Sequence, residues 1–528
     1  MSDIPITKSN DLNNWSDHAQ VQKDTLEIQV GSSNAANWGD TLGAIAPTDS
    51  RYQFWVDWNN DGTFTGEDEY ITDDVIEADW SYGRDYASQL TGNSTAGTCR
   101  ILLKNNTGKY NSFNTASSLY GSLLPGRRVQ ILMETDGGES VMWQGFLETI
   151  QPQPTIHRVH RAELRATGPF GLISQRKVNV PMQTSVTTGN AVGVLLNEIG
   201  WPGVDRDIDT GVVTMTRWWT GGEITTVTAL RSIEDTEGGF IRENKLGQIA
   251  FENRSHRTSS PHDTSQVTFS DAAGNYKYFS IGQADPIKEI FNIIEADVRF
   301  FTVGAVEVLW TSPDAPAIPK EETKSYWANF PNSDSVKNAV AVDAWTTPVA
   351  GVDWSANTAA DGGGGNLTAF VDLVVTKKDT EMEFAFTNNH TVVAAYITPF
   401  QARGTPVTED DTVTVKSTSP TSQAKYGERT YPIENHFLPD IATAETYTDY
   451  IRDKYKDPIP IIFLEYSAFT NTDLMEEARI RDVSDRITIV SDGASELGIN
   501  DDFFVERISH RVFDNGLSHT VRYECSQA

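Results

Sequence analysis

Residues that build disulfide frameworks and metal centres are scarce in this chain. Only 2 of its 528 residues are cysteine and 9 are histidine. Two thiols cannot staple a chain of this length, which excludes a disulfide scaffold of the kind found in small secreted proteins. Cys99 falls within a predicted strand, where we expect it to pack as a small core residue.

Positive charge is the next deficit. Lys and Arg together number 42 against 73 Asp and Glu, which gives a formal net charge of −31. Contact with a phosphate backbone needs clustered cations, so this balance argues against a dedicated nucleic-acid binder and against a polybasic membrane anchor. We therefore expect no sequence-specific contact with nucleic acid.

Long apolar runs are missing as well. No stretch approaches the ~20 consecutive apolar residues that cross a bilayer. The first residues, Met1 to Thr7, lack the basic and apolar regions of a signal peptide. We therefore expect no membrane span, and we expect synthesis and folding in the cytoplasm.

The chain does have the composition of a large β-rich globular protein. Hydrophobic residues make up 38% and aromatic residues 10%, with 39 Gly and 22 Pro available for turns. At ~150 residues per domain, the length predicts three to four domains. The predicted fold class is mainly β with α+β parts: two β-barrels, a small α+β middle domain and an inserted β-sandwich.

Shifts in the residue pattern divide the chain into six predicted segments. The first is polar, and aromatic strands begin with Tyr52–Trp58. The segments are 1–45 (N-terminal arm), 46–177 (first β-barrel), 178–285 (α+β middle domain), 286–329 (strands leading into the second barrel), 330–415 (inserted β-sandwich) and 416–528 (second barrel-like α+β unit).

Three helices and one hairpin are predicted in the mixed parts. Asn190–Gly200 carries apolar residues at helical spacing and stops at a glycine, and Thr228–Glu237 does the same before a pair of glycines. Phe240–Phe251 has the pattern of a β-hairpin. Thr443–Tyr455 places aromatic and aliphatic residues four positions apart, which predicts a helix with one buried face.

The strongest candidate site is a short acidic loop, Asp57–Glu69, directly after the first strand. Oxygen-bearing side chains occupy its positions 1, 3 and 5, Gly62 permits a sharp turn, and acids follow at positions 11 to 13. Alternate oxygens on a tight loop converge on one centre, which suits a hard cation such as Ca²⁺. The predicted ligands are Asp57, Asn59, Asp61, the carbonyl of Thr63, and Asp68 or, in its place, Glu69.

This loop has a second interpretation. Asn60-Asp61-Gly62 also suits a hairpin turn whose acids are simply solvated. The pattern resembles the Ca²⁺ loops of EF-hands and dockerins, but Asp68 stands where EF-hands carry Glu, and no helix is predicted before the loop. Any bound Ca²⁺ would be structural, and no other cofactor is predicted.

Catalytic patterns are absent from the sequence. It has no Gly-x-Ser-x-Gly elbow, and the Gly362–Gly365 run lacks the Lys and Ser/Thr of a phosphate loop. His157 and His160 would point to opposite faces of a strand and lack the Glu of a zinc-protease helix. We therefore predict that the chain is not an enzyme. A glycosidase stays open, because 73 acids supply many carboxylate pairs.

The strand and turn runs of the chain carry a resemblance to known proteins. The runs in the first predicted barrel are Gly83-Arg84-Asp85, Gly97–Tyr110, Leu124–Ile131 and Trp143–Leu147. Those in the middle domain and the last unit are Leu195–Pro202, Glu237–Phe240, Gly247–Arg254, Tyr426–Arg429, Ile480–Arg486 and Phe503–His510. Together these runs resemble the hub proteins of tail tips and baseplates in tailed viruses, both bacteriophages and archaeal viruses.

The resemblance implies an assembly role instead of chemistry. It implies that both barrels are tail-tube-like and that three copies form a ring, which adapts the sixfold tail tube to a threefold tip and lines the DNA channel. The implied partners are a distal tail ring protein, a tip or fibre protein and the tape-measure protein. The chain would then reside in the virion tail, after assembly in the host cytoplasm.

Two other functions stay open from the sequence. The first is a receptor- or carbohydrate-binding tail protein, with recognition in the 330–415 insertion. The second is a carbohydrate-active enzyme, which would need an aromatic cleft with paired carboxylates. Loss of adsorption on deleting the insertion would support the first function, and release of reducing sugar would support the second.

Overall fold

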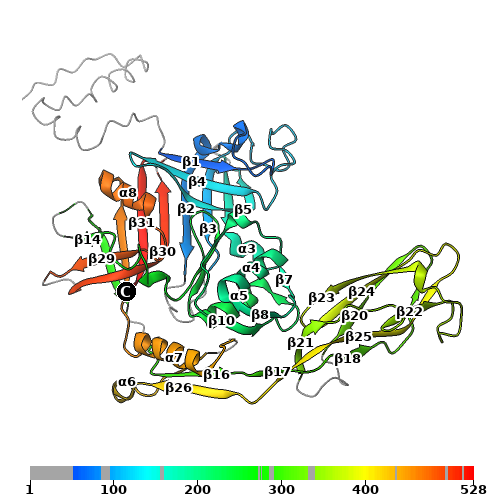
Figure 1. Cartoon of the computed structure of the whole chain (residues 1–528). Helices are drawn as coiled ribbons and strands as arrows, with labels where there is room; N and C mark the ends of the chain where they lie inside the picture. Colours follow the sequence, from blue (N-terminus) through cyan, green and yellow to red (C-terminus); the bar gives the residue numbers. More distant parts are fainter. Residues whose placement is uncertain are drawn as a thin grey trace, which may run out of the picture. The chain divides into compact units, whose positions relative to one another are not determined.

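The computed structural model (Figure 1) describes most of the chain from Arg51 onward. The described residues are 51–84, 95–154, 160–271, 274, 276–284, 290–330, 339–433, 437–493, 497–513 and 516–528. The predicted N-terminal arm, residues 1–45, lies outside them, as do Asp85 and His157. Strands dominate the described residues, which confirms the mainly β class with α+β parts.

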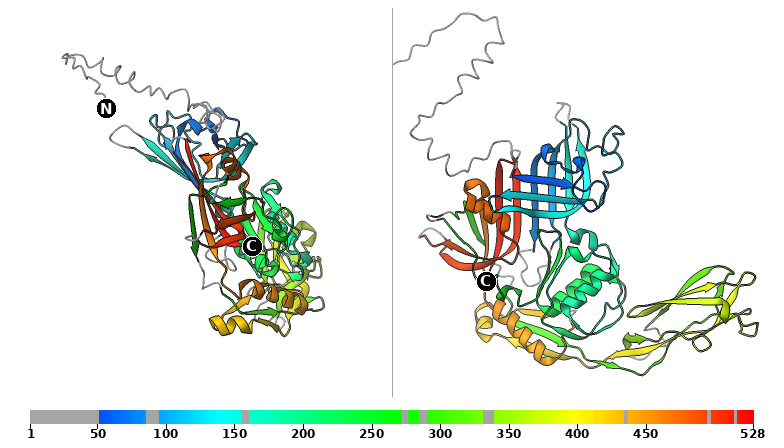
Figure 2. Two further views of the ribbon diagram at one scale, coloured as in Figure 1. Left: turned by 90° about the vertical axis from the view of Figure 1, so that its left-hand side faces the viewer. Right: turned by 45° about the horizontal axis from the view of Figure 1, so that its top comes forward.

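Six strands from the first third of the chain form one half of a large, mostly antiparallel sheet (Figure 2). They are β1 (Tyr52–Val56), β2 (Val75–Gly83), β3 (Thr98–Lys104), β4 (Arg128–Thr135), β5 (Gly138–Gln153) and β6 (Arg161–Thr167), in the sheet order β1-β4-β5-β6-β3-β2. Every second residue of β1 is buried, the alternation of a strand with one face on a core. Cys99 is buried in β3, as predicted.

Six strands from later in the chain extend the same sheet. They are β14 (Thr268–Ser270), β15 (Ser280–Ala284), β28 (Ile461–Ser467), β29 (Arg486–Ser491), β30 (Ile499–Phe513) and β31 (Ser518–Gln527). The order continues from β2 through β30, β31 and β28 to β15, while β29 pairs with β30 and β14. The seam between β2 and β30 runs from Ala78 opposite Val512 to Gly83 opposite Arg507. Strands from opposite ends of the sequence therefore share one core.

The strands predicted for two barrels are thus parts of one 12-stranded sheet. Among the described strands this sheet does not close on itself, because β1 and β15 lie at its two ends. The β1 end is covered by the chain that follows it: Ile71 N–H donates to the Phe54 carbonyl, and Phe54 N–H donates to Thr72 Oγ1.

The middle domain is built on two helices. α4 (Thr188–Glu198) and α5 (Thr226–Glu237) begin after threonines whose side chains accept a first-turn N–H, which stabilises both helix starts. α5 ends at Gly238, whose φ of 69° is left-handed. Both helices were predicted, and each begins two residues before its predicted start.

Short strands surround these helices. They are β7 (Lys177–Val178), β8 (Gln183–Thr187), β9 (Arg206–Ile208), β10 (Thr214–Trp218), β11 (Ile224–Thr225), β12 (Phe240–Glu243) and β13 (Ile249–Glu252). β12 and β13 form the predicted hairpin, and β9 pairs with β13 in parallel. A short helix, α3 (Pro169–Ile173), connects this domain to β6.

A β-sandwich with its own aromatic core occupies the insertion. Its strands are β17 (Phe301–Val303), β18 (Glu307–Thr311), β19 (Ala317–Ile318), β20 (Thr323–Asn329), β21 (Ala339–Trp345), β22 (Trp354–Asn357), β23 (Val371–Lys377), β24 (Glu381–Asn388) and β25 (Ala395–Glu409). β20-β24-β23 form one sheet, and the long β25 pairs with the other five strands. Strands from 301–329, predicted to lead into the second barrel, pair within this sandwich.

The last α+β part combines a small sheet with a helix. β16 (Ile293–Val298) lies between β26 (Val413–Thr418) and β27 (Thr430–Ile433). The predicted helix is present as α7 (Ile441–Tyr455), and it packs on β16 and β26. The other helices and helical turns among the described residues are α6 (Pro420–Tyr426), α8 (Thr472–Ile480), η1 (Glu67–Glu69), η2 (Thr72–Asp74), η3 (Gly203–Asp205), η4 (His256–Thr258), η6 (Thr368–Phe370) and η7 (Ala468–Thr470). Of the helices described, none is long and apolar enough to cross a bilayer.

Candidate functional site

The predicted cation loop is a compact turn held by its own side chains. Asp57 is buried, and its carboxylate accepts the N–H groups of Asp61 at 3.1 Å and Gly62 at 2.9 Å. Asn59 Oδ1 accepts the same Asp61 N–H at 2.8 Å, and Asp61 Oδ1 accepts the Thr63 N–H at 2.8 Å. Gly62, with a φ of 83°, supplies the left-handed backbone that the turn requires.

These hydrogen bonds join the first four predicted ligands, but the fifth is directed elsewhere. Asp68 pairs with Lys109 at 3.3 Å. Its predicted substitute, Glu69, is buried and accepts the N–H groups of Thr65 and Gly66. Within the described ranges, no group of three or more His, Cys, Asp or Glu side chains is arranged to hold a metal ion. Cation binding by this loop therefore stays a prediction.

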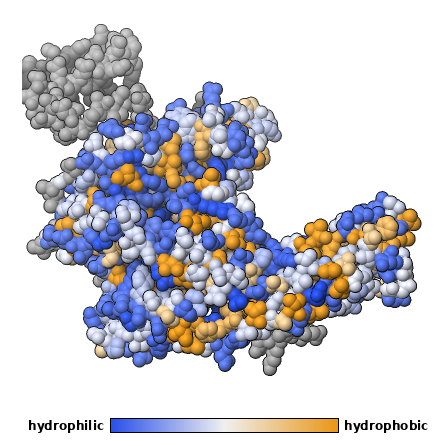
Figure 3. Space-filling model, viewed as in Figure 1, coloured by the Kyte–Doolittle hydropathy of each residue, from blue (hydrophilic) through white to orange (hydrophobic). Residues whose placement is uncertain are grey.

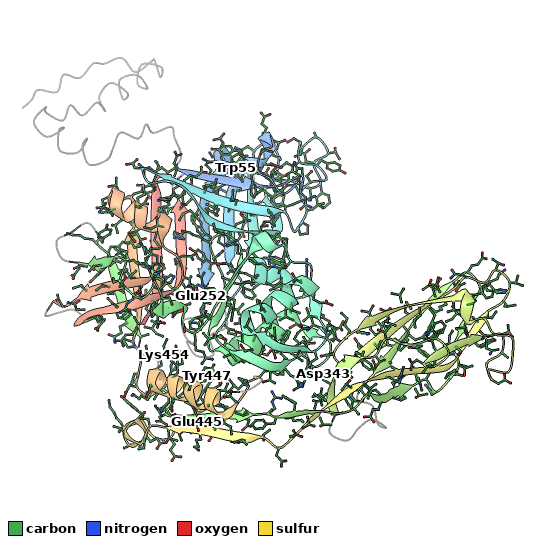
Figure 4. The ribbon with its side chains drawn as sticks, in the orientation of Figure 1. Trp55, Glu252, Asp343, Glu445, Tyr447 and Lys454 are labelled. Atoms are coloured by element: carbon green, nitrogen blue, oxygen red, sulfur yellow. The ribbon has the colours of Figure 1, made fainter. Side chains whose placement is uncertain are left out.

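The loop also turns the chain back onto the edge of the sheet. Tyr70 forms an isolated antiparallel bridge with Trp55 of β1, and the two rings lie 4.9 Å apart. Trp55 is labelled at this end of the sheet in Figure 4. The hairpin interpretation anticipates such a reversal, although the loop is longer than a two-residue turn. Hydrogen bonds from Thr63 hold the pKa of Asp61 below its usual range.

A second site lies at the seam where the two halves of the sheet meet. Gly83 ends β2 with a φ of 127°, and a Cβ there would lie 2.4 Å from the carbonyl oxygen of Glu506 in β30. Only glycine allows this approach. The N–H of Arg84 donates to the same carbonyl at 2.8 Å. The Gly83-Arg84 pair of the first resembling run is therefore explained by the contact between the two halves.

A buried cluster of charges, which we call the ionic junction, lies beside this seam. Its members are Arg84, Arg242, Glu252, Arg257, Ser484 and Glu506. The Arg257 guanidinium donates to both carboxylate oxygens of Glu506, at 2.6 and 2.9 Å, and Arg84 donates to one of them at 3.1 Å. The same two guanidiniums lie 4.5 and 3.5 Å from the ring centre of Phe240. The Glu506 carboxylate thus binds two arginines, Arg84 from the sheet and Arg257 from the middle domain.

The second carboxylate of the junction is Glu252 on β13 (Figure 4). Arg242 Nε donates to it at 2.6 Å, and Ser484 Oγ donates to its other oxygen at 2.5 Å. Arg257 Nη2 donates to Ser484 Oγ at 3.0 Å, which links the two carboxylates. The ionic junction therefore connects both halves of the sheet with the middle domain through one network of hydrogen bonds.

The surroundings set the charge of each buried carboxyl group. Burial alone would raise the pKa of Glu506 and Glu252, but the neighbouring arginines hold the first well below its usual range and lower the second to about 2. Glu243 of β12 is equally buried, but its partners are the N–H groups of Gly97 at 2.6 Å and Phe170 at 2.5 Å. Burial therefore raises the pKa of Glu243 to about 7.

Sequence reasoning did not find the ionic junction. Arg84 and Glu506 are 422 positions apart, and Arg257 and Glu506 are 249 apart, so no local spacing reveals the pairing. The one signal available was the resemblance, because several of its runs contain junction residues: Gly83-Arg84-Asp85, Gly247–Arg254 and Phe503–His510.

Comparison with solved structures finds tail proteins and a component of a secretion system. The tail protein from Neisseria meningitidis is 8% identical with a TM-score of 0.44, over 90% of this chain and 96% of that one. The 43 kDa tail protein of prophage MuSo2 from Shewanella oneidensis is 8% identical with a TM-score of 0.45, over 90% and 97%. A component of the E. coli type VI secretion system is 7% identical with a TM-score of 0.35, over 86% and 74%.

The chain is thus similar to tail proteins, the class that the sequence resemblance predicted. No family model matches the chain, and no curated protein matches it. The identities are 7–8%, and the TM-scores lie below 0.5.

Proposed function

We propose that this chain is the structural hub of a viral tail tip or baseplate, in which three copies form a ring that adapts a sixfold tail tube to a threefold tip. The observation that carries the proposal is the continuous sheet built from both ends of the sequence. Two strand sets in each of three copies would present six similar units around a ring, which suits a sixfold neighbour. The sequence resemblance supports the same role.

The proposal places subunit contacts at the ends of the sheet. β15 has a strand neighbour on one side only among the described strands, and an open strand edge is a template for further pairing. Closing three sheets into one ring would remove such ends. The ring would contact a distal tail ring protein, a tip or fibre protein and the tape-measure protein. The net charge of −31 would let DNA pass without binding.

The mass of the native assembly tests this proposal. Native mass spectrometry should give three times the 58.4 kDa of one chain, and negative-stain images should show a ring with a pore. Gly282→Lys places a charge on β15, where a Cβ would meet only Phe463 at 3.7 Å, and it should reduce trimer formation. Gly282→Ala is the matched control. A Gly282→Lys chain that assembles as well as the control would contradict contacts at β15.

We also propose that the outer face of the β20-β24-β23 sheet binds a glycan. Trp327 of β20 is 44% exposed and lies opposite Glu383 of β24. Val374 of β23 is 68% exposed and lies opposite Ala385. A flat face with an exposed indole beside a carboxylate suits stacking on a sugar ring with hydrogen bonds to its hydroxyls. Apolar side chains gather over these strands in Figure 3.

A glycan array with the isolated protein tests this second role. Trp327→Ala should lower binding about tenfold, because an aromatic anchor carries much of such an interaction. Val349→Ala, which changes another exposed apolar residue of the β-sandwich, should leave binding unchanged. Equal binding by Trp327→Ala and the parent would reject the glycan face. Release of reducing sugar by the parent chain would contradict the proposed non-enzymatic role.

A further inference from the structure

A cavity of about 380 Å³ lies between α7, the β12–β13 hairpin and the ends of β30 and β31. It is distinct from the sheet ends and from the sandwich face. Figure 4 labels Tyr447 and Lys454 on α7, next to the hairpin that carries Glu252. The lining side chains that matter here are Phe240, Arg254, Arg257, Tyr450, Lys454 and Phe504. The walls therefore carry aromatic rings and three cationic groups, together with one carboxylate, Asp453.

Two of these cations lack a hydrogen-bond acceptor. The Nε and Nη2 atoms of Arg254 are buried without a partner. The nearest carboxylate is Glu237, at 3.9 Å, and it already accepts hydrogen bonds from Thr188 and from the N–H of Val213. Lys454 forms no hydrogen bond or ion pair with any residue that the structure describes. Buried donors in proteins almost always have acceptors, so the two unpartnered Arg254 nitrogens, with the partly buried Lys454 beside the same cavity, suit an anionic ligand.

The other charged groups near the cavity are already paired. Arg257 and Arg84 share Glu506, and Asp453 is bound by Arg452 at 2.9 Å. Burial and the neighbouring Arg257 and Arg84 lower the pKa of Lys454 to about 8, in spite of the opposing effect of Glu506. The cavity is therefore a positively charged site within a chain whose net charge is −31.

We propose that this cavity binds a carboxylate group presented by an acidic side chain of a protein partner. A guanidinium and an ammonium on opposite walls can bind the two oxygens of one carboxylate. Phe240, Tyr450 and Phe504 would contact the apolar stem of the incoming side chain. A nucleic-acid backbone does not suit the site, because a chain with a net charge of −31 would repel a polyanion. The proposal does not depend on the trimeric ring.

The rate at which Lys454 is acetylated measures whether an anion occupies the cavity. With the full chain at pH 8, acetic anhydride should acetylate Lys454 rapidly, and mass spectrometry of peptides measures the rate. Glutarate at about 10 mM should slow this acetylation about tenfold, if the Kd is ~1 mM as for weak small ligands. The bound anion raises the pKa of Lys454, so the pH profile of the reaction should move upward. Glutaramide, which has the same length without charge, should have no effect.

Three variants make the test specific. Arg254→Gln should abolish protection of Lys454 by glutarate. Arg254 also lies 5.0 Å from the Tyr447 ring, so its replacement could disturb folding. Lys454→Gln is therefore a second variant. Glutarate should raise the melting temperature of the parent, and Lys454→Gln should abolish this rise. Lys456→Gln is the matched control, since Lys456 does not line the cavity and its contact Asp453 keeps its ion pair with Arg452, so this variant should keep that rise.

The acetylation rates with different anions distinguish the possible ligands of the cavity. Protection by glutarate and by a peptide with adjacent glutamates, but not by glutaramide, supports the proposal. Equal protection by inorganic phosphate would overturn its preference for carboxylate. Unchanged acetylation with every anion would overturn the site altogether and leave the cavity to water.

Discussion

The acidic loop after β1 and the ionic junction beside the seam both gather carboxylates, but they neutralise them in opposite ways. In the loop, the buried Asp57 and the exposed Asp61 accept backbone N–H groups. In the junction, Glu506 is buried and is held by two arginines. The loop therefore orders a few residues locally, whereas the junction connects segments from both ends of the sequence.

Glu243 shows which of these differences matters. It combines the partners of the loop, backbone N–H groups, with the burial of the junction. Its pKa is raised to about 7, whereas arginines lower that of Glu252, on the same hairpin, to about 2. Two N–H groups do not offset the loss of hydration of a buried carboxylate, but one or two guanidiniums do.

Glu506→Gln is expected to have the largest effect. It keeps the side-chain shape but leaves two buried guanidiniums without their carboxylate, which should lower the free energy of unfolding by about 3–5 kcal/mol. Urea denaturation followed by tryptophan fluorescence measures the loss.

Glu465→Gln is the matched control for that prediction. Glu465 lies in β28 of the same sheet and pairs with Arg522 at 3.2 Å, but both side chains are partly exposed. Its loss should cost less than about 1 kcal/mol. If the two variants were equally stable, burial would not distinguish the junction from a surface ion pair.

The pH dependence of stability sharpens the comparison within the hairpin. The folded pKa of Glu243, about 7, lies above its ordinary value of 4.5, so ionisation is harder in the folded chain. Its contribution is most favourable below pH 4.5 and falls by up to roughly 3 kcal/mol as the pH rises through 7. Glu243→Gln should remove this slope, which urea denaturation at pH 5, 6, 7 and 8 would measure.

The contribution of Glu252 to stability should have the opposite pH dependence, which Glu252→Gln would remove. The folded pKa of Glu252, about 2, lies below 4.5, so its contribution is present above pH 4.5 and is lost as the pH falls toward 2. Between pH 5 and 8, the difference between this variant and the parent should stay constant. A slope of the same sign for both variants would contradict the assigned roles of the arginines.

Local order was predictable from the sequence, and the long-range contacts were not. α5 and the β12–β13 hairpin follow from spacing and glycines within a dozen residues. The sequence also contains a local signal for α8, because Asn471 caps the helix and Leu474 and Ala478 share its buried face. Its nine residues are nevertheless too few to give a clear periodic pattern. The seam of β2 with β30 depends on pairing across almost the whole chain, which no local window contains.

The cation loop illustrates the same limit. Spacing placed Asp57, Asn59, Asp61 and Thr63 correctly in one turn, because such turns are determined by neighbouring residues. Local spacing could not predict that Asp68 pairs with Lys109, because Lys109 lies far along the chain. The fifth ligand was therefore the least predictable member of the set.

Removing the central acceptor of the loop should have a smaller effect than any change in the junction. Asp57→Ala leaves the N–H groups of Asp61 and Gly62 without this acceptor, which should cost about 1–2 kcal/mol. Hydrogen exchange at the Gly62 amide should accelerate in parallel. Glu67→Ala, an exposed change in the same loop, should alter neither measurement. Slow exchange at Gly62 in Asp57→Ala would show that the backbone holds the turn by itself.

Calcium should give the smallest effect, and the geometry of the loop explains why. A bound Ca²⁺ must replace hydrogen bonds that the Asp57 and Asp61 carboxylates already make, so affinity should lie in the weak range of roughly 10⁻⁴–10⁻³ M. At about 1 mM Ca²⁺ this corresponds to a gain of about 0.4–1.4 kcal/mol in stability. Differential scanning calorimetry should show a small rise in melting temperature with Ca²⁺, none with Mg²⁺, and none in Asp61→Asn. An equal rise in Asp61→Asn would place the ion outside this loop, and the turn would then be ordered by hydrogen bonds alone.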